Sequence, residues 1–355
     1  MLFKIYKKLV FISSLLWCLS SSAQECCGDD CECGKSDISP AGIMNDHTHE
    51  KGKWMFSYRY MHMNMSGNII GDKNITDNDV YAIYNYSMSP STMTMDMHML
   101  MAMYGVSDRF TIMAMASYNT SSMNMNMFSS GSSMNMPGMS SDVAMPNKQS
   151  ISGFGDTKVY GLFSLAKNDE LQIVVNVGIN IPTGSINAIA FPGINNSLRA
   201  DYIMQPGTGT IDFMPGISLL KHNSNFDWGA QLNGTLRPFY NANGYHYCNE
   251  AIAEIWISKK WNNWLSNSVR LETIANGGIA GTDASLITLM EPSADAANYG
   301  GSKAYLFPGI NFYPGTFLSS DIKLRFEYGF PVYQYAFGIQ MKNQETLIAN
   351  LDFVF

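Results

Sequence analysis

The chain has 355 residues and a formal net charge of −7, from 22 basic and 29 acidic residues. Charged residues make up only 14%, well below the quarter or so of an ordinary soluble domain, although the apolar share of 46% is ordinary. The acidic balance argues against nucleic acid as a partner. No run of 18 apolar residues follows the first two dozen positions, so no membrane-spanning helix is predicted.

The first 23 residues have the features of a secretory signal peptide. Lys4, Lys7 and Lys8 form a basic start, a short apolar run follows, and Ser21 and Ala23 are small residues before a cleavage site. Removing the three lysines leaves 19 basic against 29 acidic residues, a net charge of −10. We therefore expect a chain exported across an inner membrane.

Residues 24–50 are predicted to form an N-terminal tail in the periplasm. Its soft-ligand candidates are four closely spaced cysteines and two histidines: Cys26, Cys27, Cys31, Cys33, His47 and His49. As thiolates the cysteines would bind a soft metal, whereas an oxidising periplasm favours two disulfides. Both interpretations stay open, and the spacing is not that of a paired-cysteine zinc site.

Residues 51–355 are predicted to be all-β, as a transmembrane, antiparallel up-and-down β-barrel of about 12 strands. Several segments alternate strictly between apolar and polar residues; the run from Leu171 to Ile179, for example, has Gln172 and Asn176 at even positions. This period of two indicates strands, not helices. A barrel puts one face into lipid and the other into its lumen, which explains a low charge content without long apolar runs.

The predicted connections alternate between short and long, as in outer-membrane barrels. Short turns are expected near 105–109, 167–170, 222–225, 262–263 and 314–316, with longer connections around 66–92, 120–151, 182–206, 241–247, 276–300 and 331–344. The chain also ends in an alternating strand that closes with Phe355. This end resembles the signal read by the barrel assembly machinery, so the outer membrane of a Gram-negative bacterium is the expected location, with its lipid as a partner.

Methionine is the most unusual feature of the predicted first three strands. Twenty of the 26 methionines fall between Met55 and Met145, many at every second position. Because aromatic and aliphatic residues occupy the opposite face, the methionine face is predicted to line the lumen. The candidate soft ligands are Met61, Met63, Met65, Met97, Met99, Met101, Met103, Met113 and Met115.

These methionines have two interpretations. Thioethers are soft ligands that select Cu(I) over hard cations, so the lumen is a candidate path or site for a soft metal ion, with Cu(I) as the one cofactor considered. Alternatively, methionine fills an irregular interior. The second strand fits less well because Asp96 and His98 lie on its otherwise apolar face. The strand is expected to bulge or to leave the membrane near His98.

The rest of the lumen is predicted to be polar and mixed in charge. Its candidates are Arg59, Asp156, Lys158, Asp212, Arg237, Glu254, Arg270, Lys323, Arg325 and Glu327. Opposite charges inside a barrel either pair and fill it or line the path of a solute, and the sequence leaves both open.

Several short blocks resemble an outer-membrane transporter family named after the meta-cleavage pathway of phenol degradation, and its methionine-rich branch in particular. They are 153–156 (GFGD), 181–185 (IPTGS), 205–210 (QPGTGT), 331–334 (PVYQ), the turn 104–109 (YGVSDR) and the region 43–65. The resemblance covers about residues 39–355. It implies a monomeric barrel with a transport role, without fixing a substrate.

The sequence thus favours a barrel that transports or binds a small solute, such as a soft metal ion, with a channel for small aromatic or organic compounds as the alternative. A structural or adhesive barrel and an outer-membrane hydrolase are further alternatives. The chain has no nucleophile-elbow, HExxH or phosphate-loop motif, so it is not expected to be an enzyme. Asp96 with His98, or His246, would be the residues of a hydrolase site.

Overall fold

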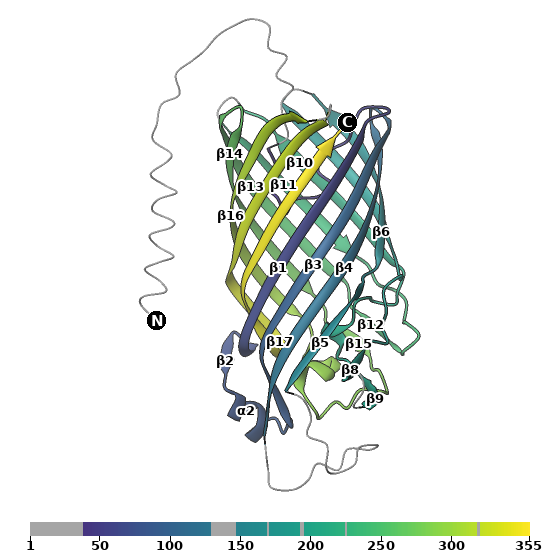
Figure 1. Ribbon diagram of the computed structural model, residues 1–355, viewed down its shortest axis with the longest axis vertical. Coiled ribbons are helices and arrows are strands. Elements are labelled where there is room, and N and C mark those ends of the chain that lie inside the picture. Colours follow the sequence, from purple (N-terminus) through teal and green to yellow (C-terminus); the bar gives the residue numbers. More distant parts are fainter. Residues whose placement is uncertain (1–37, 129–146, 169, 192–194, 224–225, 318–319) are drawn as a thin grey trace, which may run out of the picture. The chain divides into compact units, whose positions relative to one another are not determined.

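The computed structural model describes residues 38–128, 147–168, 170–191, 195–223, 226–317 and 320–355 (Figure 1). The predicted signal peptide and the four tail cysteines lie outside these residues. No helix among the described residues is long and apolar enough to cross a membrane.

Eleven strands form one closed antiparallel ring. In spatial order they are β1 (Trp54–Gly71), β3 (Met88–Ser107), β4 (Phe110–Met127), β6 (Thr157–Lys167), β7 (Leu171–Ile181), β10 (Asp212–Lys221), β11 (Asp227–Thr235), β13 (Glu250–Asn262), β14 (Leu265–Asn276), β16 (Gly301–Phe317) and β17 (Ser320–Val354). Apart from the closing pair, ring neighbours follow one another along the chain. The predicted up-and-down barrel is therefore confirmed.

Closure joins the first and the last strand of the ring. β1 pairs with β17 from Met55 opposite Val354 to Gly71 opposite Ala336. β17 also pairs with β16 from Phe317 opposite Ser320 back to Gly301 opposite Ala336. This 35-residue strand therefore supplies two successive wall segments that meet near Ala336. Counted in this way, the ring has twelve segments, in agreement with the predicted number.

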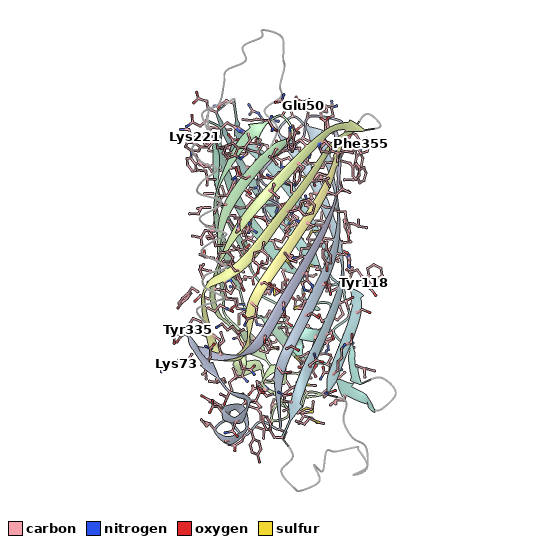
Figure 2. All side chains as sticks on the ribbon, turned by 60° about the vertical axis from the view of Figure 1, so that its left-hand side comes forward. Glu50, Lys73, Tyr118, Lys221, Tyr335 and Phe355 are labelled. Carbon is pink, nitrogen blue, oxygen red and sulfur yellow. The ribbon has the colours of Figure 1, made fainter. Side chains whose placement is uncertain are left out.

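The connections are short at one end of the barrel and long at the other (Figure 1). The long-connection end, here called the loop end, carries these small elements: β2 (Lys73–Ile75), α2 (Asp77–Ala82), β5 (Lys148–Phe154), β8 (Ile189–Phe191), β9 (Asn195–Arg199), β12 (Tyr245–Tyr247), β15 (Ile279–Gly281) and the 3-10 turns η2 (Tyr202–Met204), η3 (Pro292–Ala294) and η4 (Ala296–Asn298). The opposite, turn end holds Glu50, Lys221 and Phe355 (Figure 2).

Two predicted connections differ from the structure. The short turn predicted at 314–316 differs from the structure, because β16 and β17 stay paired up to Phe317 and Ser320. The prediction of a long loop at 331–344 was wrong, because these residues belong to the continuous strand β17. Hydrogen bonds between Gln334 and Asn343 tie its two halves together, so the chain reverses tightly.

Side chains alternate between the lumen and the outer surface as predicted. On β7, Val177 and Ile179 are 61% and 44% exposed, whereas Asn176 and Asn180 are almost fully buried. Tyr118 of β4 projects from the outer surface (Figure 2). The wall therefore presents apolar groups outward and polar groups inward.

The prediction that β3 bulges near His98 was wrong. β3 pairs with β1 without a register shift from Tyr104 to Thr92, and with β4 without a shift from Gly105 to Thr92. Asp96 and His98 do face outward, where Tyr60 and His62 contact the Asp96 carboxylate at 2.5 and 2.8 Å. The outer surface simply becomes polar toward the loop end, as expected if the strand leaves the lipid there.

Candidate functional site

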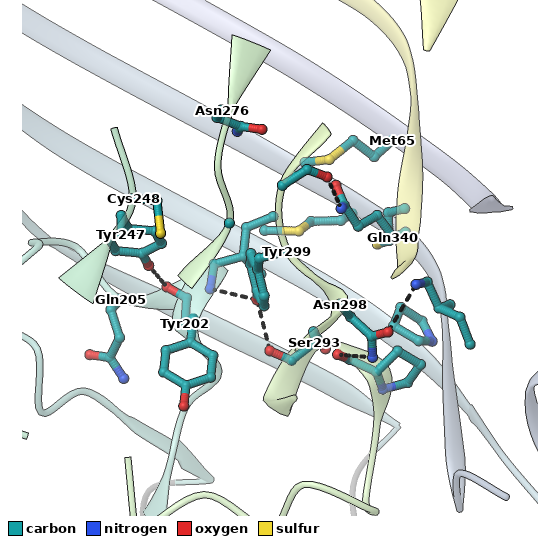
Figure 3. Close-up of a pocket in the computed structure, with 18 of the residues that line it drawn as sticks. Met65, Tyr202, Gln205, Tyr247, Cys248, Asn276, Ser293, Asn298, Tyr299 and Gln340 are labelled. Carbon is teal, nitrogen blue, oxygen red and sulfur yellow. Dashed lines mark hydrogen bonds between the residues drawn. The ribbon is translucent and has the colours of Figure 1, made fainter. Parts of the chain in front are cut away.

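A cavity of about 350 Å³ lies in the lumen beneath the loops of the loop end (Figure 3). Its wall combines residues of β1, β3, β4, β13, β14, β16 and β17 with residues of the connections 182–211, 236–249 and 277–300. Such a volume is at the lower end of the range for small-molecule sites. This cavity is the candidate site.

One wall of the cavity is built from methionines. Met65, Met93 and Met123 lie on β1, β3 and β4, and Met341 comes from β17. Met65 pairs with Met93, and Met93 with Met123, so the first three stand side by side across neighbouring strands. All four are buried. This wall is mostly apolar surface and thioether sulfur, with Asn68 and Gln340 as polar neighbours.

The facing wall carries tyrosines from the loops. Tyr247 donates a hydrogen bond from its hydroxyl to the Tyr202 carbonyl at 2.7 Å, and Tyr299 donates to the Ser293 carbonyl at 2.7 Å (Figure 3). Burial raises the pKa of both Tyr247 and Tyr299 well above the usual range, which keeps the phenols neutral. These bonds fix the tyrosine rings, so the wall is preformed.

Charged groups reach the cavity from three positions. Arg237 donates to the Cys248 carbonyl at 2.7 Å, and its Nε lies 3.5 Å from a carboxylate oxygen of Asp212. Lys303 and Glu250 line the same cavity. Because Arg237 has a carboxylate partner and Lys303 shares the wall with Glu250, the formal charges of these four groups offset one another.

Asp156 holds the loops over the cavity. Its carboxylate accepts hydrogen bonds from the backbone N–H of Gly184 and of Thr208, both at 2.9 Å, and from the Thr208 hydroxyl at 2.6 Å. Gly184 and Gly207 pack so closely that a Cβ atom on either would collide with the other's backbone. Three of the blocks that carry the family resemblance, at 153–156, 181–185 and 205–210, therefore meet at this carboxylate.

Residues 38–50, assigned from the sequence to the tail, lie inside the lumen toward the turn end. Most of this segment, here called the lumen segment, is buried, including Ile38, Ala41 and Ile43. Arg59 donates to the carbonyls of Gly42 and Ile43, and the Gly42 N–H donates to Glu327 at 2.5 Å. The lumen is thus occupied by backbone that charged wall residues hold in place.

A buried ion cluster lies beside the lumen segment. Arg270 is fully buried and contacts Glu254 at 2.7 Å, Glu272 at 2.6 Å and Glu327 at 3.0 Å. Its guanidinium also stacks 3.9 Å from the centre of the Phe307 ring. This cluster places four charged side chains in the lumen, paired with one another.

The other predicted lumen charges also face inward. Arg325 contacts Asp352 at 2.6 Å and donates to the Ser39 carbonyl. Asp156 and Asp212 are buried, and Lys158 and Lys323 are half-buried. The structure therefore brings most of the predicted charges into contacts with one another or with the chain, although not into one common site.

The predicted soft ligands of the first three strands all line the lumen. Met65, Met99, Met101, Met103, Met113 and Met115 are buried, and Met61, Met63 and Met97 are half-buried. Of the tail candidates, His47 contacts Asp46 at 2.7 Å, and its ring centre lies 5.0 Å from that of His49. No group of three His, Cys, Asp or Glu residues in the described part could hold a metal ion.

The hydrolase candidates do not pair as a catalytic set. His98 lies on the outer surface with its Nδ1 2.7 Å from the Tyr58 hydroxyl, and the Nδ1 of His246 lies 2.9 Å from the Tyr247 carbonyl. Asp96 instead contacts Tyr60 and His62.

Sequence reasoning missed the tyrosine wall and Asp352. Asp352 is fully buried and accepts a hydrogen bond from Ser57 at 2.5 Å. Its place between Leu351 and Phe353 in the last alternating strand was a signal that would have assigned it to the lumen. The tyrosines lie in long connections, where no periodic pattern indicates which side chains face a cavity.

Comparison with known proteins shows the fold. No protein-family profile matches the sequence, and no curated protein matches it. An outer-membrane channel from Pseudomonas putida F1 is similar in structure, with a TM-score of 0.57 and 12% identity over 87% of this chain and 97% of that chain. This chain has the fold of an outer-membrane barrel. The location predicted from the sequence is supported at that level, while the phenol-pathway family stays a prediction.

Two other solved structures cover similar shares with lower scores. The toluene transporter TbuX of Ralstonia pickettii has a TM-score of 0.41 and 10% identity over 90% of this chain and 94% of that chain. The transport unit of the autotransporter AIDA-I from Escherichia coli has a TM-score of 0.43 and 10% identity over 88% and 92%.

Proposed function

We propose that the protein is an outer-membrane channel for a small, largely apolar solute about the size of one aromatic ring. The observation that carries this proposal is the cavity beneath the loops, whose walls are methionine on one side and tyrosine on the other. Sites for small molecules are mostly apolar, with a few polar groups that fix orientation. Arg237, Glu250 and Lys303 are such groups here.

The lumen below the cavity is partly occupied by the chain itself. The ion cluster around Arg270 and the lumen segment lie there, joined by the contacts of Glu327 and Arg59 with the segment. An apolar ring can bind in the cavity without breaking these contacts. In this proposal the lumen segment moves before a solute of any kind passes.

The test is to narrow the cavity. We expect Met93→Trp to slow the uptake of phenol or toluene by cells or vesicles that carry the protein at least severalfold, because the added ring fills the cavity. Met127→Trp is the matched control, since Met127 is 44% exposed at the end of β4. Unchanged phenol uptake by Met93→Trp, or a parent channel that passes a disaccharide as fast as phenol, would contradict the proposal.

A second candidate is the soft-cation role predicted from the methionines. The observation that favours it is that Met65, Met93 and Met123 are cross-strand neighbours in the wall of the cavity.

A further inference from the structure

Nearly all methionines of the described chain gather in two groups inside the barrel. The loop-end methionine cluster contains Met63, Met65, Met88, Met93, Met95, Met123, Met125, Met204, Met290 and Met341. The turn-end methionine cluster contains Met44, Met55, Met61, Met97, Met99, Met101, Met103, Met113, Met115 and Met214. Of the 21 methionines in the described residues, only Met127 lies outside both clusters.

The alternation of β1, β3 and β4 accounts for only part of this gathering. Met204 and Met290 reach the loop-end cluster from connections, Met341 reaches it from β17, and Met44 and Met214 join the turn-end cluster from the lumen segment and β10. Other apolar residues such as Ile151, Leu162 and Leu198 belong to the same clusters. Methionine is nevertheless their most frequent residue, so the interior of the barrel is rich in thioether sulfur.

Within each cluster, three methionines form a row across β1, β3 and β4. Met65, Met93 and Met123 are direct cross-strand partners at the loop end. Directly opposed residues on one face of a sheet have Cβ atoms about 4.5–5.5 Å apart, and methionine has three rotatable bonds with which to aim its sulfur. Three thioethers can therefore converge on one ion from this row.

The loop-end row borders the cavity, which gives an ion a way to the sulfur. The thiol-bearing Cys248 lines the same cavity. The charged groups Arg237, Asp212, Lys303 and Glu250 offset one another, so charge does not draw in cations in general. No group of three His, Cys, Asp or Glu residues in the described part could hold a metal, so the row of thioethers is the set of neighbouring soft donors that borders the cavity.

We propose that Met65, Met93 and Met123 form a thioether site for a soft monovalent cation, Cu(I) or its analogue Ag(I). Thioethers prefer such cations to Mg²⁺, Ca²⁺ or Zn²⁺. The ligands are neutral, so binding and release need no proton transfer, and the ion exchanges readily. This inference goes beyond the proposed route for apolar solutes and does not depend on it.

The test measures Ag(I) bound to the full mature chain, folded in detergent, by equilibrium dialysis and metal analysis. Every variant carries serine at Cys26, Cys27, Cys31 and Cys33, because thiols of the tail would bind silver themselves. We expect the triple variant Met65→Leu, Met93→Leu, Met123→Leu to bind Ag(I) at least tenfold more weakly at one site. Leucine keeps the volume and apolarity of methionine, so the variant should fold like the parent, as judged by heat-modifiable gel migration.

The matched control is the turn-end row, with Met55→Leu, Met103→Leu and Met113→Leu together. This variant should keep the silver site at the cavity. Parent-like binding by the loop-end triple variant, or equal loss in both triple variants, would overturn the assignment. Complete loss of silver from Cys248→Ser alone would overturn it as well, because the thiol would then be the site.

If heat-modifiable gel migration shows that the triple variant does not fold, a second measurement tests whether thioethers bind the ion. X-ray absorption of Cu(I) on the chain with serine at Cys26, Cys27, Cys31, Cys33 and Cys248 should show sulfur neighbours, which must then be thioethers. The single variant Met93→Leu should reduce that sulfur signal. Only nitrogen or oxygen neighbours around the copper would overturn the proposal.

Discussion

At the scale of the residue, a side chain faces the lipid or the lumen according to whether its position in the strand is odd or even. Val177 and Asn176 are neighbours in β7, yet Val177 is 61% exposed on the outer surface and Asn176 is 1% exposed in the lumen. Because successive side chains of a strand point to opposite faces, a charge at Val177 would enter lipid.

We therefore expect Val177→Arg to block assembly. Arginine on the lipid face costs about 2–4 kcal/mol near the bilayer midplane, and Val177 lies in the middle of β7. Heat-modifiable gel migration measures the folded fraction, and Val177→Leu, which keeps an apolar group there, serves as the control. Equal folding of the two variants would show that this face does not contact lipid.

At the scale of the element, the lumen segment depends on one glycine. A Cβ atom at Gly42 would collide with the guanidinium of Arg270, which itself is held by Glu254, Glu272 and Glu327. The segment can lie this close to the ion cluster only because residue 42 has no side chain.

Gly42→Val is expected to displace the lumen segment and open the turn end. Overpacking of this kind costs about 1–3 kcal/mol, which the segment can avoid by leaving while the wall stays intact. Single-channel conductance should rise above that of the parent, with unchanged heat-modifiable migration. Glu50→Val, at an exposed position of the same segment, is the control. Parent-like conductance of Gly42→Val would mean that the segment does not limit the channel.

The loops of the loop end share a buried pair of carboxyl groups. Asp201 precedes η2, Glu291 precedes η3, and both are almost fully buried. Gln149 of β5 donates to Glu291 at 3.3 Å. Burial raises the pKa of both carboxyls, and the proximity of Asp201 raises that of Glu291 further.

The raised pKa values predict loops that loosen as pH rises. A carboxyl whose folded pKa lies above its unfolded value stabilises folding below the unfolded pKa, and this contribution is lost as pH rises through the folded pKa. Between the unfolded and the folded pKa, each carboxyl raises the equilibrium constant for loop opening by up to about tenfold per pH unit. Hydrogen exchange of the loop amides, corrected for its intrinsic pH dependence, measures the opening.

Two variants check this pH dependence. Asp201→Asn with Glu291→Gln should flatten the exchange profile, because neither amide titrates. Asp72→Asn, on the exposed turn after β1, should leave the profile as in the parent. A profile that stays steep without the two acids would assign the effect to other groups.

At the scale of the whole molecule, the barrel is completed by its last residue. The Phe355 N–H donates to the Trp54 carbonyl at 2.8 Å, and the Trp54 N–H donates to the Phe355 carbonyl at 3.3 Å. The ring centres of Phe56 and Phe355 lie 6.1 Å apart. Closing the ring removes the exposed strand edges that lipid cannot satisfy.

Deleting Phe355 is expected to slow membrane insertion and leave more chain in the periplasm. Two backbone hydrogen bonds are lost, each worth about 0.5–1.5 kcal/mol in water. Phe355→Ala keeps these bonds and removes only the ring, so it separates backbone closure from the aromatic side chain. Cell fractionation gives the inserted share, and a normal share for the deletion would argue against a role of this residue in closure.

The sequence by itself determined the barrel and the face of each strand. Alternation is local, so the apolar residues around Val177 and the methionines of β1, β3 and β4 could be assigned to outside and lumen without coordinates. The charged lumen residues Arg270 and Glu327 were found by the same rule. The alternation leaves little freedom in the register of a strand. A shift by one residue would turn its apolar side chains into the lumen and its polar side chains into the lipid.

Only the tertiary structure decided what occupies the lumen. The place of residues 38–50, the meeting of three loops at Asp156 and the tyrosine wall depend on contacts between segments far apart in the chain. The same holds for Met204, Met290 and Met341, which join the loop-end cluster from separate elements. Loops have no period that records their neighbours, so their packing follows from the closed wall around them and not from any local pattern.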